Sequence, residues 1–198
     1  MALFGAVCVC SCATGAPPHG EPNIMYGMVV GMTARMPNGP GINPVEGTWR
    51  LWDAFQIDRA VLRGWWEDDC PVMARFLPNA TSGEMPQAPI KATAYVQHGE
   101  ATFIAVASWS NTTETFVLEI DWTSLGLDAK KTAICAPQIE NVQRVAPGGA
   151  VPASSSGLPV YVFKDGEPIE VPAHSGWWLL LTTRPILECN GTALAAVQ

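Results

Sequence analysis

The chain has 198 residues, of which 48% are hydrophobic and 15% are charged, and its formal net charge is −7. This composition can build an apolar core but offers no basic patch, since Lys130 and Lys131 are the only adjacent basic residues. We therefore expect no nucleic-acid partner and no electrostatic attachment to an anionic membrane. No apolar run approaches the ~20 residues that a membrane-spanning helix needs, so no membrane span is expected either.

Residues 1–22 share two features with a secretory leader, an apolar stretch followed by small residues. They lack the basic residues with which such a leader begins. Glycosylation sequons at Asn79, Asn111 and Asn190 favour export only mildly, because such short motifs also arise by chance. Secretion and an arbitrary start within a longer reading frame both stay open as explanations of this segment.

The six cysteines do not form a recognisable metal site. Three of them crowd into the first dozen residues, but no second cluster supplies the remaining ligands of a tetrahedral site. The other three are scattered, as is typical of small buried side chains. These are Cys70, Cys135 and Cys189. We expect neither a metal ion nor another cofactor.

Residues 24–32 form a short, continuous apolar run that is typical of a buried strand. Asn43 and Pro44 then supply the N-cap and the first position of a helix that ends near Phe55. Its apolar positions recur at intervals of three and four residues (Trp49, Leu51, Trp52 and Phe55). A strand, a loop and a covering helix make a βα unit, which needs further strands beside it. We therefore expect residues 23–74 to be the end of a larger α/β domain.

Residues 75–90 are rich in proline and poor in apolar side chains, which predicts a linker. From 91 to 184 the pattern changes to short strands separated by turn formers, as is typical of a β-sandwich. Residues 185–198 are expected to be a tail. The predicted strands cover residues 92–97, 102–109, 115–122, 132–136, 141–145, 160–163, 169–171 and 177–182.

The clearest strand signal lies in the middle of the chain. Apolar and mostly polar residues alternate over 115–122, which predicts a strand with one buried face. Residues 102–109 are apolar on both faces, as expected of a central strand. The polar cluster at 110–113 predicts that these two strands form a hairpin. The dipeptide Asp165-Gly166 predicts a second, tighter hairpin.

Two groups of short motifs stand out. The first comprises Tyr26-Gly27-Met28, Arg35-Met36-Pro37, Trp49-Arg50-Leu51-Trp52-Asp53-Ala54-Phe55, Gly64-Trp65-Trp66 and Cys70-Pro71-Val72. The second comprises Ala107-Ser108-Trp109, Ile120-Asp121-Trp122, Leu125-Gly126-Leu127 and Gly176-Trp177-Trp178. In this order they resemble the C-terminal third of bacterial proteins related to glycoside hydrolase family 123.

The resemblance implies a mainly β fold, an antiparallel C-terminal β-sandwich preceded by a remnant βα unit of a (β/α)8 barrel. Residues 24–66 would be the last strand and helix of that barrel, and the sandwich an accessory domain packed against it. Characterised members of the family remove terminal N-acetylgalactosamine by substrate-assisted hydrolysis, using an adjacent Asp-Glu pair. This chain contains no Asp-Glu dipeptide, so we assign no catalytic residue.

Three residues are candidates for contact with a sugar. Arg35 follows the expected barrel strand, where barrel enzymes place groups that contact substrate. Trp65 and Trp66 are adjacent, so in a strand one of them points away from the core, either to cover the domain interface or to stack on a sugar. The tryptophans on apolar strand faces or on the helix stripe are expected to pack internally (Trp49, Trp52, Trp109 and Trp122).

Other polar groups have a simpler explanation. The acidic run Glu67-Asp68-Asp69 could hold a cation, but such runs are more often solvated bends. His98 and His174 lie in predicted loops without a nucleophile motif nearby.

The sequence thus predicts a fragment of a glycoside hydrolase-like protein, related to N-acetylhexosaminidases, that retains the accessory sandwich and lacks the catalytic carboxylate pair. Its alternative is a free-standing carbohydrate-binding or structural β-sandwich. The expected partner is a glycan, together with the missing barrel or a second copy reached through exposed apolar surface.

Overall fold

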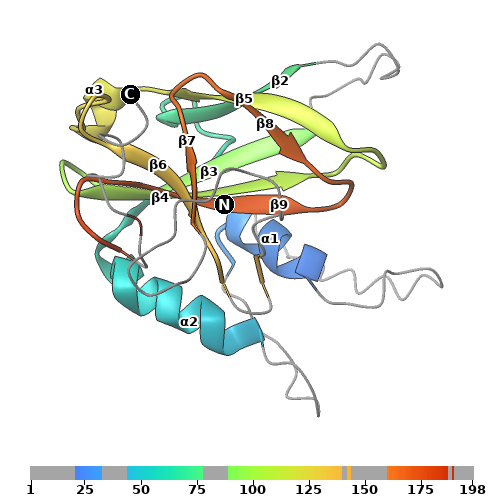
Figure 1. The fold of residues 1–198 in the computed structure, drawn as a ribbon, viewed down its shortest axis with the longest axis horizontal. Coiled ribbons are helices and arrows are strands. Elements are labelled where there is room, and N and C mark those ends of the chain that lie inside the picture. Colours follow the sequence, from blue (N-terminus) through green and yellow to red (C-terminus); the bar gives the residue numbers. More distant parts are fainter. Residues whose placement is uncertain are drawn as a thin grey trace, which may run out of the picture.

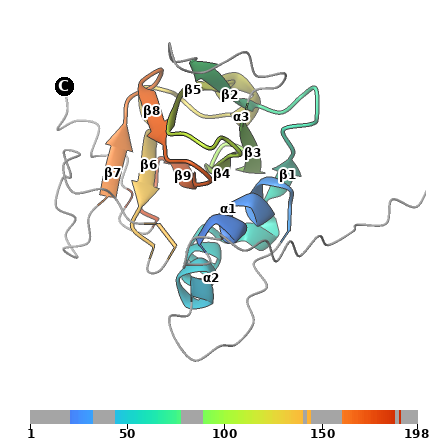
Figure 2. The ribbon, with the colours of Figure 1, turned by 90° about the vertical axis from the view of Figure 1, so that its right-hand side faces the viewer.

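The computed structural model describes residues 21–32, 44–77, 89–139, 142–143, 160–186 and 189. In this part of the chain two antiparallel sheets pack face to face, and helices cover the outer face of the larger sheet (Figure 1). Seen from the side, the molecule has three layers, with the smaller sheet, the larger sheet and the helices in that order (Figure 2). The prediction of a mainly β, antiparallel, sandwich-like fold is confirmed.

The larger sheet consists of β1 (Val61–Arg63), β3 (Ile90–Gln97), β4 (Ala101–Ser108), β6 (Ala133–Pro137), β7 (Val160–Phe163) and β9 (Gly176–Thr182). Their order across the sheet is β1-β3-β4-β9-β6-β7. The smaller sheet consists of β2 (Val72–Leu77), β5 (Glu114–Ile120) and β8 (Pro168–Val171), with β5 in the middle. Every neighbouring pair is antiparallel.

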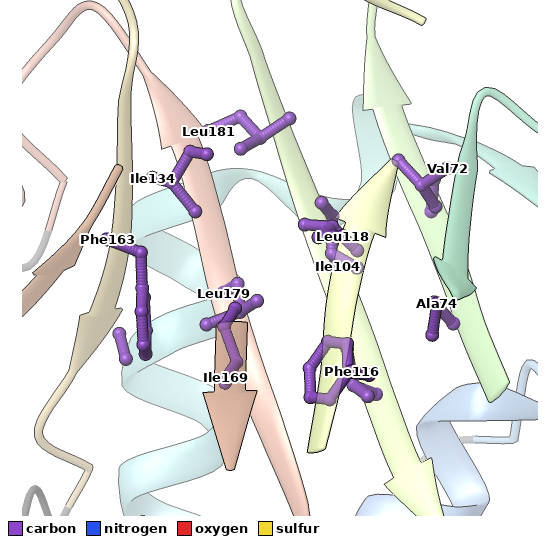
Figure 3. Packing of buried hydrophobic residues seen from close by; sticks show 14 of the residues in the cluster. Val72, Ala74, Ile104, Phe116, Leu118, Ile134, Phe163, Ile169, Leu179 and Leu181 are labelled. Atoms are coloured by element: carbon purple, nitrogen blue, oxygen red, sulfur yellow. The ribbon is translucent and has the colours of Figure 1, made fainter. Parts of the chain in front are cut away.

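The sandwich core lies between the two sheets (Figure 3). Phe116 and Leu118 come from the smaller sheet, and Ile104, Leu179 and Leu181 come from the larger one. All five are at most 4% exposed. Because side chains alternate along a strand, every second residue of β5 points into this core. Burying a side chain of this size stabilises the fold by about 1.5–3 kcal/mol.

A second core lies on the other face of the larger sheet, beneath helices α1 (Glu21–Val29) and α2 (Pro44–Phe55). Leu51 and Phe55 of α2 and Met28 of α1 pack there with Phe103 and Trp178 of the sheet. The two cores explain why β4 is apolar on both faces, as predicted, since its alternate residues face the helices and the other sheet.

The strand predicted at residues 24–32 is wrong, because this segment forms helix α1. Met25, Met28 and Val29 are buried at the i, i+3 and i+4 positions of one helix face. Gly31 ends the helix in a left-handed conformation (φ 74°), and the N–H of Met32 donates to the carbonyl of Gly27 at 2.8 Å. A short apolar run does not distinguish a strand from a buried helix. The expected βα unit therefore lacks its strand among the described residues.

The predicted linker at 75–90 begins too early, because β2 continues to Leu77. Val72 and Ala74 point into the sandwich core, whereas Met73 is 56% exposed. Arg75 forms an ion pair with Glu119 on the neighbouring strand. This edge strand buries only one face, so it lacks the apolar density that would mark it in the sequence.

Both predicted hairpins are wrong in the same way. β4 pairs with β3 and β9, whereas β5 pairs with β2 and β8 in the other sheet. The segment 109–113 therefore crosses between the sheets, and the turn at Asp165-Gly166 connects β7 to β8 across the sheets as well. Turn formers encode a change of chain direction, but they do not encode the partner of the next strand.

Two short helical segments complete the described fold, a 3-10 turn at Ile57–Arg59 and helix α3 at Trp122–Leu125. Most of the strand expected at 141–145 lies outside the described residues. Gln143 forms an isolated bridge with Ile139.

Candidate functional site

Trp65 and Trp66 lie in the turn that leads from β1 of the larger sheet to β2 of the smaller sheet. Their side chains are part of the solvent-exposed surface, at 41% and 50% exposure. The ring centroids are 5.8 Å apart and the ring planes are nearly perpendicular, at 87°. Because the pair sits in a turn instead of a strand, both rings reach solvent.

Three local contacts hold this pair in place. A Cβ on Gly64 would lie 2.4 Å from the Trp66 ring, so that ring rests directly on the backbone of Gly64. The N–H of Trp65 donates to Oγ1 of Thr93 at 3.3 Å, and that hydroxyl donates to the carbonyl of Val29 at 2.6 Å. The turn is thereby fixed to β3 and to the end of α1.

Lys91 of β3 lies over the ring of Trp65, with Nζ 4.6 Å from the ring centroid. An ammonium group in this position is attracted by the ring quadrupole, by about 0.5–1 kcal/mol at an exposed site. Lys91 is paired in register with Ala107, a residue of the core beneath the helices. Its side chain is therefore on the helix side of the sheet. No ion pair of Lys91 occurs among the described residues.

A second aromatic pair joins α1 to the end of β4. The rings of Tyr26 and Trp109 are stacked, with centroids 4.8 Å apart and planes 26° apart. The hydroxyl of Tyr26 donates to the carbonyl of Ser108 at 2.9 Å, and burial raises the pKa of Tyr26. Trp109 is 43% exposed, so the expectation that it packs internally is wrong.

The remaining tryptophans divide between surface and core. Trp49 is 56% exposed, which contradicts its expected place in the packed helix stripe. Trp52 and Trp122 are half-buried against the two cores, as expected. Trp177 and Trp178 point to opposite faces of β9, and both faces are covered, since Trp178 is fully buried and Trp177 packs against the sandwich core.

The acidic bend at residues 67–69 is partly neutralised by one arginine. Nη1 of Arg63 lies 3.6 Å from Oε2 of Glu67 and 3.2 Å from Oδ2 of Asp69. Among the described residues no group of three or more His, Cys, Asp or Glu side chains could hold a metal ion.

A polar cluster occupies the crossing between the sheets. Glu114 is 1% exposed and accepts hydrogen bonds from the hydroxyls of Ser110 and Thr112, both at 2.6 Å. Nε2 of His174 lies 2.7 Å from Oδ1 of Asn111, whose sequon is exposed. These contacts order the crossing segment, which is a structural role.

Two of the scattered cysteines, Cys135 and Cys189, form a disulfide between β6 and the segment after β9. Both are fully buried. Cys70 is a free thiol whose pKa is raised, chiefly by burial.

Of the three predicted site residues, the structure brings Trp65 and Trp66 together, while Arg35 lies outside the described residues. Tyr26 and Lys91 were not among the residues that the sequence singled out for a site. A charged residue on a strand whose other side chains are mostly buried was the available signal for Lys91. The arrangement of aromatic rings beside an ammonium group can bind a ligand.

No helix in the described part of the chain is long and apolar enough to cross a membrane. Comparison with known proteins gives one family, the C-terminal domain of glycoside hydrolase 123, whose model matches residues 44–182. No curated protein and no solved structure matches the chain. Because the match covers more than half of the chain and coincides with the two-sheet fold, this protein belongs to the glycoside hydrolase 123 C-terminal domain family.

Proposed function

We propose that this chain is the accessory β-sandwich portion of an N-acetylhexosaminidase-related protein and that it contributes glycan binding, not hydrolysis. The family match and the sandwich fold support a glycoside hydrolase-related protein. The absence of an Asp-Glu dipeptide from the sequence supports a role without the catalytic step.

The observation that carries the proposal is the exposure of both Trp65 and Trp66 in one ordered turn. An exposed indole that is already fixed by its surroundings loses little entropy on binding, which favours stacking against the apolar face of a sugar ring. Gly64 and Thr93 supply that fixation. The perpendicular rings present two stacking surfaces to a ligand.

Three of the described acidic residues are already engaged with other groups of the protein. Glu67 and Asp69 are held by Arg63, and Glu114 is buried among hydroxyl groups. In the proposal, the acid and the positioning carboxylate belong to a separate catalytic barrel, because the helices and strand of residues 44–66 pack on the sandwich itself. Arg35 would position substrate beside that barrel.

Binding assays with the isolated chain test the proposal. The probes are a chitin hexasaccharide and an oligosaccharide that ends in N-acetylgalactosamine. Their binding is measured by calorimetry and by quenching of tryptophan fluorescence. Replacing Trp65 and Trp66 together by alanine should weaken binding about tenfold, since each stacking contact is worth about 0.5–1.5 kcal/mol. Trp49→Ala is the matched control, because Trp49 is also an exposed indole but lies on α2.

The alternative is that the same surface is covered by protein, either by the barrel or by a second copy of the chain. Several large apolar side chains just after α1 and in the turn after β1 are exposed (Val30, Met32, Trp65 and Trp66). Light scattering across a concentration series distinguishes the two proposals. Dimers that dissociate in the double tryptophan variant, with no glycan binding by the wild type, would support the alternative and contradict the first proposal.

A further inference from the structure

Lys91 and Trp109 are neighbours on one face of the larger sheet. Lys91 lies opposite Ala107 in the pairing of β3 with β4. The N–H of Trp109 donates to the carbonyl of Pro89 at 2.8 Å, which continues this pairing by two residues. Diagonal neighbours of this kind in an antiparallel pair are about 7–8 Å apart and lie within reach of long side chains. Lys91 therefore lies between Trp65 on one side and Trp109 on the other.

Helix α1 borders the same surface. Tyr26 stacks on Trp109 at one end, and Val30, four residues later, is 43% exposed. Residues four apart share one side of a helix, so Tyr26 and Val30 follow the same line along the sheet. At the C-terminal end of α1 the carbonyl of Val29 accepts a hydrogen bond from the hydroxyl of Thr93, and that hydroxyl accepts one from the N–H of Trp65. We call the surface formed by Tyr26, Val30, Trp65, Trp66, Lys91 and Trp109 the aromatic strip.

The charge of the aromatic strip is positive at its centre. Within the described residues Lys91 has no carboxylate partner. Glu67 and Asp69, which follow Trp66 in the chain, form ion pairs with Arg63. Arg63 pairs in register with Ala94, a residue of the sandwich core, so it starts from the opposite face of the sheet. An ammonium group framed by aromatic rings favours an anionic group over a neutral one.

We propose that the aromatic strip binds an oligosaccharide that carries acidic groups, with sugar rings on the two aromatic pairs and a carboxylate or sulfate at Lys91. This inference rests on the proposed glycan-binding function and specifies its ligand class. Two aromatic pairs on either side of one cation require a ligand longer than a single sugar. A neutral glycan would leave the ammonium group of Lys91 without a counter-charge.

A chondroitin hexasaccharide tests the inference, because it alternates N-acetylgalactosamine with a uronic acid. Its carboxyl-reduced form is the neutral probe of the same length. We expect the wild type to bind the acidic form about fivefold more tightly, which is the upper range for one exposed ion pair. Lys91→Gln should abolish this ratio and Lys91→Arg should preserve it. Lys164→Gln, which removes an exposed lysine in the turn after β7, should leave it unchanged.

The aromatic contribution is measured with Trp109→Ala, which should weaken binding of both probes equally, since stacking does not depend on ligand charge. Circular dichroism and thermal melting establish that each variant is folded. Raising the salt concentration should reduce the ratio between the two probes and spare binding of the neutral one.

The outcomes separate this inference from the function on which it rests. Equal binding of both probes, lost on replacing Trp65 and Trp66, would overturn the acidic ligand and leave glycan binding intact. Binding of neither probe would overturn both. Binding of the acidic probe that depends on Lys91 but not on Trp109 would overturn the two-sided aromatic strip.

Discussion

The side-chain amide of Gln143 binds the backbone of Trp178 as a neighbouring strand would. Its Nε2 donates to the carbonyl of Trp178 at 2.9 Å, and its Oε1 accepts from the N–H of Trp178 at 2.7 Å. The same Nε2 also donates to the carbonyl of Pro137 at 2.9 Å. One side chain thus satisfies three buried backbone groups. It does so at Trp178, just beyond the point where the pairing of β9 with β6 ends.

Replacing Gln143 by leucine should lower the free energy of unfolding by about 3 kcal/mol, because buried backbone groups are left without partners in a site closed to water. Urea unfolding followed by tryptophan fluorescence measures the loss. If Gln143→Leu changes the free energy of unfolding by less than the error of the measurement, this account of Gln143 is wrong.

Gly64→Ala should displace the ring of Trp66 without disturbing the core. The new Cβ would lie 2.4 Å from ring atoms, too close to be accommodated without movement. Since Trp66 is half exposed, its ring can move into solvent, so we expect a change in tryptophan emission and weaker glycan binding at nearly unchanged stability. Gly166→Ala is no suitable control because of its left-handed backbone. Trp49→Ala serves instead as the control for the binding measurement.

The disulfide between Cys135 and Cys189 closes a loop of 54 residues. In the chain-entropy description a cross-link of this span stabilises the fold by about 4 kcal/mol. We expect the double variant Cys135→Ala, Cys189→Ala to have a free energy of unfolding that is lower by that amount, and therefore to unfold at a lower denaturant concentration. Wild-type protein in reducing buffer should behave like the variant, and an unchanged midpoint on reduction would refute the role of the disulfide.

Asp121 should contribute to stability at neutral pH and lose that contribution in acid. Its carboxylate caps α3, accepting from the N–H of Ser124 at 3.0 Å and from its hydroxyl at 2.6 Å. These bonds lower the pKa of Asp121 below 3.8, with the hydroxyl as the larger cause. A lowered folded-state pKa means that the contribution is complete above the ordinary value and disappears as the pH falls through the lowered one. Melting temperatures of the wild type and Asp121→Ala should therefore converge as the pH falls below the ordinary range of an aspartate.

Tyr26→Phe tests how α1 is attached to the sheet. The variant keeps the stacking on Trp109 and removes the hydrogen bond to Ser108. We expect a loss of about 1 kcal/mol, the usual net value of such a bond. Hydrogen exchange should place this loss in α1, with the amides of β4 still protected. A loss spread over both sheets would contradict a local attachment.

Several features of this protein follow from local patterns. The alternation over 115–122 predicts the buried face of β5, and the double apolar pattern of 102–109 predicts a strand covered on both sides. Asn43 and Pro44 predict the start of α2, whose described bounds agree. The motif order predicts the family. Each of these depends on sterics and side-chain alternation within a few residues.

What the sequence did not reveal depends on contacts between distant residues. Helix α1 forms because Met25, Met28 and Val29 face strands β3, β4 and β9, which lie more than sixty positions later in the chain. β4 and β5 belong to different sheets because β4 pairs with β3 and β9, and β5 pairs with β2 and β8. The turn between β4 and β5 does not by itself decide this pairing.

The candidate site shows the same division. Trp65 and Trp66 could be selected from the sequence as adjacent aromatics, but only the tertiary structure places Lys91, Trp109 and Tyr26 beside them. Whether an indole is buried or exposed is decided by what packs over it. Trp178 is fully buried in the core beneath the helices, whereas Trp49 and Trp109 are exposed. Local sequence determines the strands and which of their faces are apolar. Long-range packing determines which side chains stay exposed to solvent and can contact a ligand.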